Sequence, residues 1–309
     1  MRQNHLHVVV ALAASTMASA SVLREPSSLV RERGLPSWPR YRGGADIDLD
    51  LEEEDTIDEP ASLEEEAPAT VKAGGAAAEA GDVPDIPAAR ALTRDEIIEK
   101  LNAIPTFCIL NGDEGVVAMK LADDAKPSVM WFLDPEEAQA VLGAAVKDKP
   151  DAGLRLGCHG LGAVFEQCNG WGDADAGATA TAASGDQIQL KLMGPYGIVK
   201  EVAPKLQELM RNQGMDPGDW QCPVFMCDQL QSRRIVPVFF NPADLAKTWA
   251  TAGRKAEELP ENLTVMDVRM LVQNMLTDSS PWELIQFVGS QEAVKLAQDV
   301  AAKQAGQGA

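Results

Sequence analysis

The sequence is poor in the residue types that carry most enzyme and metal chemistry. It has five cysteines and three histidines among 309 residues, and His159 is the only histidine beyond the first seven residues. No two cysteines form a C-x-x-C pair, so neither a thioredoxin motif nor a zinc knuckle is present. A catalytic triad would depend on that one histidine, and no nucleophile-elbow motif supports it. The sequence therefore predicts no catalytic residue, no metal ligand and no cofactor.

Basic residues are also scarce. The chain has 27 Lys and Arg against 47 Asp and Glu, a net charge of −20. This charge is uneven: residues 1–45 carry +4, residues 46–66 carry −12, and residues 67–309 carry a further −12. An acidic body repels phosphate backbones, which argues against nucleic acid as a partner.

The first 45 residues have the composition of a two-part targeting leader. The apolar run Leu6–Ala14 is too short for a bilayer, which takes about 20 residues, and a small-residue motif follows it at Ala18–Ala20. Residues 1–20 are therefore predicted to be a signal peptide, with a frayed helix as the alternative. Residues 21–45 are rich in Arg and Ser, as in a transit peptide. The leader resembles those of algal plastid proteins, but Ser21 replaces their usual aromatic residue, which leaves secretion open.

Residues 46–91 lack apolar periodicity. An acidic run is followed by a stretch rich in Ala, Gly and Pro, the composition of a disordered linker. The folded body is predicted to cover residues 92–303, and residues 304–309 form a tail.

Within this body one stretch occurs twice. RIVPVFFNPADLAKTW at residues 234–249 is matched by SVMWFLDPEEAQAVL at residues 128–142, with Phe132 matching Phe239 and Pro135 matching Pro242. Upstream of these stretches, IPTFCIL is similar to CPVFMCD, and two further pairs of segments match downstream in the same order. The sequence thus predicts a duplicated unit, with halves at about 104–213 and 222–303.

Each half alternates short apolar runs with amphipathic segments. This pattern predicts an α+β fold of two pseudo-repeated lobes, each a small sheet with helices packed on one face. The expected strands cover residues 105–110, 115–121, 129–133, 154–156, 188–193, 223–227, 235–240, 263–265 and 284–288. One helix is expected to follow Thr93. Three more are expected to begin at Pro135, Pro195 and Pro242, the last of them reaching Glu258. The remaining helices are expected around Val164, around Leu271 and at Gln291–Lys303. Residues 168–186 are expected to be a surface insertion.

The motifs IPTFCILNGDEGVV, WFLDPEEAQAVL, CPVFMCDQ, RRIVPVFFNPADLAKTW and FVGSQEAVKLA resemble the Tic-twenty-two-like family. The resemblance covers residues 92–303, and the strand followed by Asn-Pro or Asp-Pro is its most specific element. The family comprises soluble proteins of the chloroplast intermembrane space and the cyanobacterial periplasm, so the resemblance implies a soluble protein of such a compartment. It also implies a two-lobed fold with apolar pockets on the sheets, acting as a chaperone-like carrier of precursor proteins, peripheral to a membrane at most.

The resemblance brings no catalytic residue with it. By position, it implies a binding surface formed by apolar sheet residues, for which the alternative is that they are simply core. These residues are Phe107, Val117 and Phe132 in the first half, and Phe225, Val238 and Phe240 in the second.

The functional hypothesis is a non-enzymatic import factor of the plastid intermembrane space, with precursor proteins and translocon components as partners. Two alternatives remain open: an accessory structural subunit of a plastid membrane complex, and a redox protein that uses its cysteines. The missing C-x-x-C pair argues against the redox protein.

Overall fold

The computed structural model describes residues 7–8, 89–120, 126–172, 178–181, 187–232, 234–260 and 263–307. His7–Val8 form a two-residue strand, β1, paired with β3. The rest of the predicted signal peptide, the transit-like segment and the linker as far as residue 88 lie outside these ranges. Regular packing begins slightly before the predicted start of the body, because the backbone N–H of Arg90 donates to the carbonyl of Ser280.

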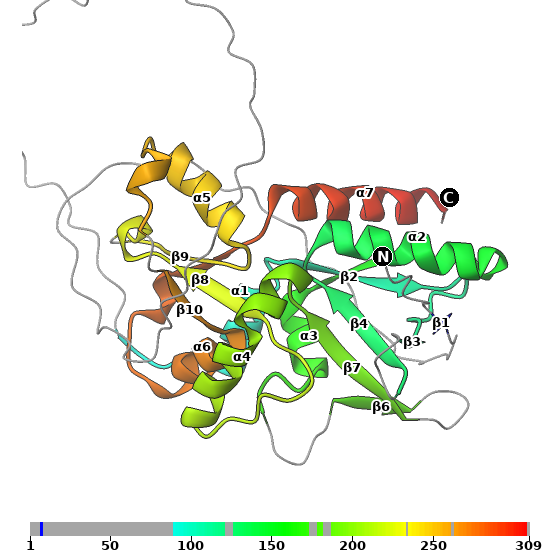
Figure 1. The fold of residues 1–309 in the computed structure, drawn as a ribbon, viewed down its shortest axis with the longest axis horizontal. Helices are drawn as coiled ribbons and strands as arrows, with labels where there is room; N and C mark the ends of the chain where they lie inside the picture. The colour runs from blue at the N-terminus through cyan, green and yellow to red at the C-terminus, as the bar shows by residue number, and fades with distance from the viewer. Residues whose placement is uncertain are drawn as a thin grey trace, which may run out of the picture.

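The described body contains two separate sheets, which confirms the predicted α+β fold with two lobes (Figure 1). The first sheet consists of β1 with β2 (Pro105–Leu110), β3 (Met119–Lys120), β4 (Ser128–Phe132), β5 (Arg155–Gly160), β6 (Thr179–Thr181) and β7 (Gln187–Met193). The second consists of β8 (Pro223–Met226), β9 (Val236–Phe239), β10 (Thr264–Asp267) and β11 (Ile285–Val288).

The helices connect and cover these strands. They are α1 (Arg94–Leu101), α2 (Pro135–Asp148), α3 (Leu161–Gln167), α4 (Tyr196–Asn212), α5 (Pro242–Thr251), α6 (Val268–Thr277) and α7 (Gln291–Gln307). Short 3-10 turns lie at Pro150–Ala152, Asp228–Leu230, Ala256–Glu258 and Trp282–Leu284.

Local sequence signals explain where the helices begin. Thr93 and Glu96 form a capping box on α1, since each side chain satisfies the other residue's backbone N–H. Asp134 caps α2 and Asn241 caps α5, with proline following each cap. Glu137 at the third position of α2 does not complete a capping box with Asp134, because its carboxylate accepts from the backbone N–H of Tyr196.

The strand pairings of the two halves correspond. The order β5-β2-β4-β7 in the first sheet has the same directions as β10-β8-β9-β11 in the second: antiparallel, antiparallel and parallel. The registers correspond as well, because Phe107 pairs with Phe132 as Phe225 pairs with Phe239. This correspondence agrees with the sequence matches that predicted a repeat.

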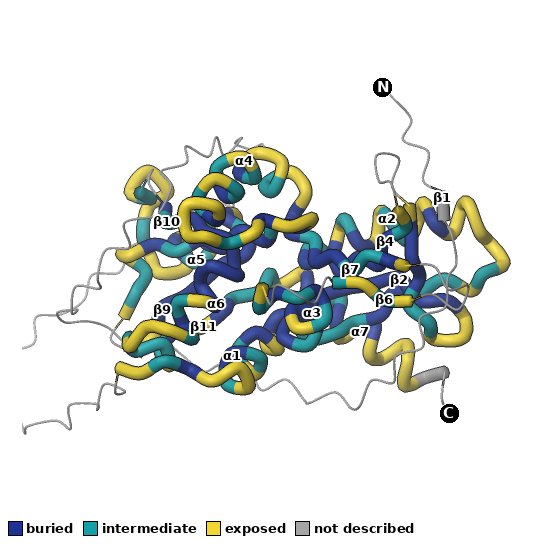
Figure 2. The backbone as a smooth tube through the Cα atoms, turned by 90° about the horizontal axis from the view of Figure 1, so that it is seen from below, coloured by how far each residue is buried: buried dark blue, intermediate teal, exposed yellow. Residues whose placement is uncertain are grey.

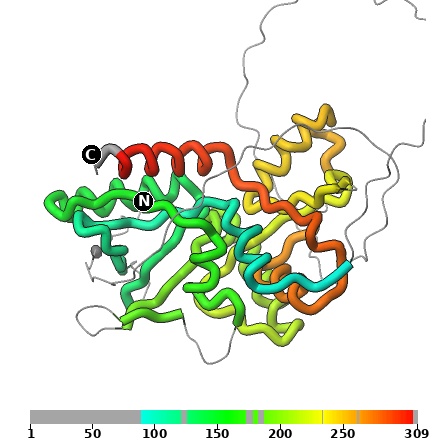
Figure 3. Tube along the Cα trace, turned by 180° about the vertical axis from the view of Figure 1, so that it is seen from behind, coloured from blue at the N-terminus to red at the C-terminus, as the bar shows by residue number. Residues whose placement is uncertain are grey.

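The last helix of each half packs on the sheet of the other half. Helix α4 follows β7 of the first sheet but contacts β8 and β10, while α7 follows β11 of the second sheet but contacts β2 and β5. Figures 1 and 3 both show α7 running alongside α2 over the first sheet. The two lobes therefore exchange a helix, and neither sheet is covered by its own half alone.

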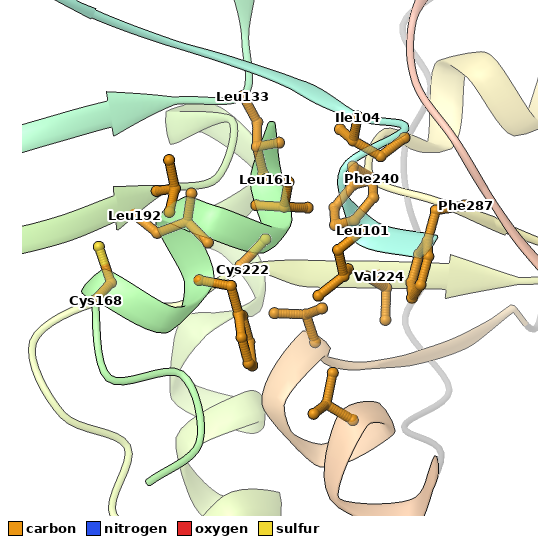
Figure 4. Packing of buried hydrophobic residues seen from close by; sticks show 14 of the residues in the cluster. Leu101, Ile104, Leu133, Leu161, Cys168, Leu192, Cys222, Val224, Phe240 and Phe287 are labelled. Carbon is orange, nitrogen blue, oxygen red and sulfur yellow. The ribbon is translucent and has the colours of Figure 1, made fainter. Parts of the chain in front are cut away.

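Three clusters of apolar side chains make up the core, and both faces of each sheet contribute to it. Figure 2 shows that the buried parts of the backbone run through the strands of both lobes. We call the cluster shared by both lobes the central cluster. It includes Ile104, Leu133, Leu161 and Leu192 of the first half with Cys222, Val224, Phe240 and Phe287 of the second (Figure 4). The helices thus do not lie on one face only: α2, α4, α5 and α7 cover the outer faces, and α1, α3 and α6 pack around the central cluster.

Several predicted elements have different bounds in the structure, among them one strand that is shortened, one that is lengthened and one helix that ends early. The predicted strand at 115–121 is reduced to β3, because the Asn111 side chain accepts from the backbone N–H groups of Asp113 and Gly115 and holds a loop there. Strand β5 is three residues longer than predicted: it covers Arg155–Gly160 instead of residues 154–156. Helix α5 ends at Thr251 instead of continuing to Glu258, since Gly253 adopts φ +74° and stops the helix.

Candidate functional site

The six apolar residues of the predicted binding surface are all buried, and they are divided among the three clusters. Phe107, Val117 and Phe132 lie on the outer face of the first sheet. Phe225 lies on the outer face of the second sheet. Val238 and Phe240 belong to the central cluster. In this structure they pack as core, so access to any of them requires movement of the helices that cover it.

The outer face of the first sheet combines large and small side chains. We call this set the first outer cluster; its buried members are Phe107, Ile109, Val117, Met119, Met130, Phe132, Ala138, Ala145, Leu156, Ala293, Ala297 and Val300. Most of the large buried side chains come from the strands, whereas α2 and α7 contribute mainly alanine to the buried set. The larger side chains of these helices, Val141, Leu142 and Leu296, are only partly buried. Dispersion and hydrophobic stabilisation grow with buried apolar area, so these helices gain little from each buried alanine.

The outer face of the second sheet is held differently. The second outer cluster contains Val202, Leu206, Phe225, Cys227, Phe239, Leu245, Trp249, Leu263 and Val265. Here the covering helices α4 and α5 insert large side chains, and Trp249 is also fixed by donating its indole N–H to the Lys255 carbonyl at 2.7 Å. The Arg254 guanidinium lies 4.5 Å from the Trp249 ring centre. The two faces are equivalent in topology and unequal in how firmly they are covered.

A small pocket lies where the lobes meet. Its volume is about 30 Å³, which corresponds to roughly one water molecule and is too small for a peptide side chain of any size. It is bounded by the starts of four helices, at Asp134, Pro195, Asn241 and Ser290. This pocket is a seam between the lobes and does not by itself form a ligand site.

Carboxylates gather around this seam. Partial burial raises the pKa of Glu137, and the N–H of Tyr196 opposes that shift. Partial burial likewise raises the pKa of Asp244, an effect reduced by Lys247 and reinforced by Glu292. Lys247 lies 3.2 Å from Glu292 and links α5 to α7 through an exposed ion pair. Exposed pairs of this kind contribute about 0–1 kcal/mol, so this contact fixes α7 only weakly.

The cysteines lack the environment of reactive thiols. All five are free, and burial raises the pKa of each; that of Cys158 is about 11 and that of Cys108 about 12. Redox-active cysteines have a depressed pKa instead. His159 is no partner for Cys158, because neighbouring strand residues face opposite sides of the sheet. Burial lowers the pKa of His159, which keeps its imidazole neutral at pH 7.

One buried ion pair was not anticipated from the sequence. Asp267 caps α6 and is fully buried; it accepts from the backbone N–H of Cys222 and from Arg269, whose Nε lies 2.9 Å from Oδ1. The Arg269 guanidinium also donates to the Trp220 carbonyl at 2.7 Å and lies 4.2 Å from that indole's ring centre. The pair joins the start of α6 to the segment that leads into β8, so its role is structural. The only sequence signal for it is an Asp at the start of an apolar helix pattern.

Within the described residues, no group of three His, Cys, Asp or Glu side chains is placed to hold a metal ion. No helix in this part of the chain is long and apolar enough to cross a membrane.

The fold and these faces define a two-lobed α+β protein whose sheets carry apolar surface beneath exchanged helices. No protein-family model and no curated protein matches the chain. Two similar solved structures are Anabaena Tic22, described as a protein-transport protein, and Tic22 from Plasmodium falciparum. The first is 15% identical with a TM-score of 0.44, and the match covers 67% of this chain and 97% of the Anabaena chain. The second is 20% identical with a TM-score of 0.46, and the match covers 67% of this chain and 98% of the Plasmodium chain. Both bear the name of the family that the sequence motifs resemble.

Proposed function

We propose that the protein is a non-enzymatic protein-import factor that carries precursor proteins in transit by binding their apolar segments reversibly. The observation that carries this proposal is the first outer cluster. There the large side chains of β2 and β4, among them Phe107 and Phe132, are covered by helices that bury mainly alanine. A carrier needs apolar surface that opens and closes at small cost, because permanently exposed surface of this kind promotes aggregation.

Charge supports the same function. The segment from residue 67 to the end carries a net charge of −12, and transit peptides of the kind predicted at residues 21–45 are rich in arginine. Opposite charges accelerate encounter and add a salt-dependent contribution to affinity. Apolar burial would then retain the precursor segment after encounter. Phe107, Val117, Phe132, Phe225, Val238 and Phe240 remain the candidate contacts, reached when the covering helices move.

The proposed location is the plastid intermembrane space, reached by a signal peptide followed by a transit peptide, with translocon components as further partners. This part of the proposal is supported by the family resemblance of residues 92–303 and by the composition of the leader. If the leader acts only as a signal peptide, the protein is secreted instead.

An accessory subunit of a membrane complex is the other candidate. Such a subunit would need a permanent interface, and the exposed large hydrophobic side chains of the described residues lie on separate elements: Val146, Tyr196 and Ile235. Scattered apolar residues do not form an interface core. A cysteine-based redox protein is disfavoured by the burial of the thiols and their raised pKa values.

Cross-linking in isolated plastids tests the proposal. A precursor is stalled during import, cross-linked, and recovered with antibody against this protein; the link is expected to form and to vanish when import is chased to completion. Absence of any precursor cross-link, with the protein folded inside the plastid, would contradict the carrier. Recovery of a stoichiometric membrane complex that persists through the chase would favour the accessory subunit.

The electrostatic part has its own test. The purified chain is titrated with a fluorescent Arg-rich transit peptide at low and high salt, with a charge-neutral peptide of the same apolar content as control. Binding of the basic peptide should weaken several-fold at high salt, whereas the control should change little. Equal salt dependence of the two peptides would remove charge from the mechanism.

A further inference from the structure

Helix α7 occupies a groove on the first lobe that its own half does not build. It follows β11 of the second sheet, crosses the seam at Gly289–Ser290 and lies on β2 and β5 beside α2 (Figure 3). Its inward face consists of Ala293, Leu296, Ala297 and Val300, at helical spacing. The floor beneath the helix is formed by the larger side chains of β2 and β5 in the first outer cluster.

The equivalent helix of the other half is anchored more firmly. Helix α4 packs on β8 and β10 as α7 packs on β5 and β2, but its buried residues are Val202, Leu206 and Met210. The N-terminus of α4 is also held by the Glu137 carboxylate, which accepts from the N–H of Tyr196. At the start of α7 the link to its neighbour α5 is the exposed pair of Lys247 and Glu292. Of the two exchanged helices, α7 is therefore the one whose departure costs less.

We propose that the groove on β2 and β5 is a binding site for an amphipathic helix of a partner protein, and that α7 is its resident occupant. The partner helix takes the place of α7 and presents the same inward pattern: small residues at i and i+4, aliphatic residues at i+3 and i+7. The groove selects this pattern because large side chains at the first two positions would meet the floor formed by Phe107 and its neighbours. The identification of the partner as a precursor segment rests on the proposed function. The assignment of the groove as a helix-binding site does not depend on that function.

The protein contains a reporter for this exchange. Cys158 of β5 packs at the edge of the first outer cluster, whereas Cys108, Cys168 and Cys222 belong to the central cluster and Cys227 to the second outer cluster. Cys158 is only partly buried in the intact structure, whereas the other four cysteines are buried. Departure of α7 is therefore expected to increase the labelling rate of Cys158 and to leave the other four protected. Maleimide labelling followed by mass spectrometry of the peptides therefore separates release of α7 from unfolding.

The first experiment uses the wild-type protein and measures hydrogen exchange of the α7 and α4 amides. The α7 amides should exchange faster by about tenfold or more, together with labelling of Cys158 alone. Equal exchange of the two helices would overturn the proposal, because α7 would then open only with the rest of the fold.

The second experiment compares Ala297→Glu with Ala302→Glu. Both add one carboxylate to α7, but Ala297 is buried against the first sheet and Ala302 is exposed. The first variant should label at Cys158 and bind a synthetic peptide of residues 290–307 in trans; the second should behave as wild type. Protection of Cys158 in the folded first variant would overturn the proposal, as would simultaneous labelling of all five cysteines.

Competition separates this proposal from the proposed function. Precursor protein is added to Ala297→Glu carrying the fluorescent 290–307 peptide, and release of the peptide is followed by anisotropy. Release supports both proposals. If the precursor binds but the peptide is not released, the carrier function is retained and the proposal that precursor proteins bind in this groove is overturned. Peptide exchange without any precursor binding retains the groove and overturns the carrier function.

Discussion

Phe225 of β8 lies directly opposite Phe239 of β9, and this pair is the register match between the two strands. The first sheet has the same relationship between Phe107 and Phe132. Directly opposed residues on an antiparallel pair place their side chains on the same face of the sheet, and all four rings are buried. Each lobe thus buries two opposed aromatic residues on the outer face of its sheet, at positions that also match between the two halves of the sequence.

The second aromatic pair is expected to be a centre of stability. Phe225→Ala and Phe239→Ala should each lower the free energy of unfolding by about 3–5 kcal/mol, since both remove a fully buried ring. The double variant should cost less than the sum, because both rings belong to the second outer cluster and lie at opposed positions. Urea denaturation measures all three. Ile235→Ala, which alters a side chain 37% exposed, is the control and should cost less than about 1 kcal/mol.

The buried ion pair should be strongly coupled. Asp267→Ala leaves the Arg269 guanidinium buried without its carboxylate and removes the cap of α6, so a loss of about 3–5 kcal/mol is expected. Arg269→Met should cost less, because Asp267 keeps the backbone N–H groups of Cys222 and of residue 269 itself. A double-mutant cycle by thermal or urea denaturation gives the coupling energy. Independent, additive losses would show that the pair does not act as a unit.

Removing the charge of Glu137 should change the pH profile of stability. Its pKa is raised in the folded protein mainly by burial, so its contribution is complete below its ordinary value of 4.5 and is lost as the pH rises through the folded value. Glu137→Gln keeps an oxygen to accept from Tyr196 and should abolish this decline. Glu137→Ala loses the acceptor and should cost about 1 kcal/mol. Denaturation between pH 4 and 8 tests both; Glu136→Gln, at an exposed neighbour, should retain the wild-type profile.

The thiols make the protein sensitive to alkali. The folded pKa of Cys158 is about 11 against an ordinary value of 9.0, so folding favours the neutral thiol. The stability this provides is complete below pH 9.0 and is lost as the pH rises towards 11. Cys158→Ala should therefore flatten the fall of unfolding free energy across that range. A thiol titration that found any of the five cysteines ionising below its ordinary value would contradict this and revive the redox hypothesis.

The exchanged helices make the two halves depend on each other. Residues 89–213 contain the first sheet apart from β1 and lack α7, and residues 214–309 contain the second sheet and lack α4. Each half expressed alone is expected to bind a hydrophobic dye, since it exposes one outer face. Mixing them should restore the far-UV and near-UV circular dichroism of the whole chain. A half that folded alone to a cooperative, dye-free state would show that the exchanged helix is dispensable.

Local and repeated features of the fold were predictable from the sequence. The helix starts after Thr93 and at Pro135 and Pro242 were predictable, because cap side chains and proline act on backbone groups only a few residues away. The α+β class followed from apolar periodicity, and the correspondence of Phe132 with Phe239 followed from the alignment of the two halves. The end of α5 was missed although Gly253 marks it, since the apolar pattern was extended past the glycine.

Only the tertiary structure decided what covers each sheet. Strand alternation separates Phe107 from Cys108 onto two faces, but it contains no information about which face meets solvent and which meets a helix. That depended on α4 and α7 crossing to the opposite lobe, where each buries apolar surface against strands distant in sequence. The burial of Phe107 beneath α7 and of Phe225 beneath α4 is a consequence of this exchange. Val238 and Phe240 are instead buried in the central cluster. The sequence was enough to predict the α+β class and the approximate positions of most strands and helices. Long-range packing determined how the two sheets are covered, because hydrophobic burial is non-directional and is settled only when all surfaces meet.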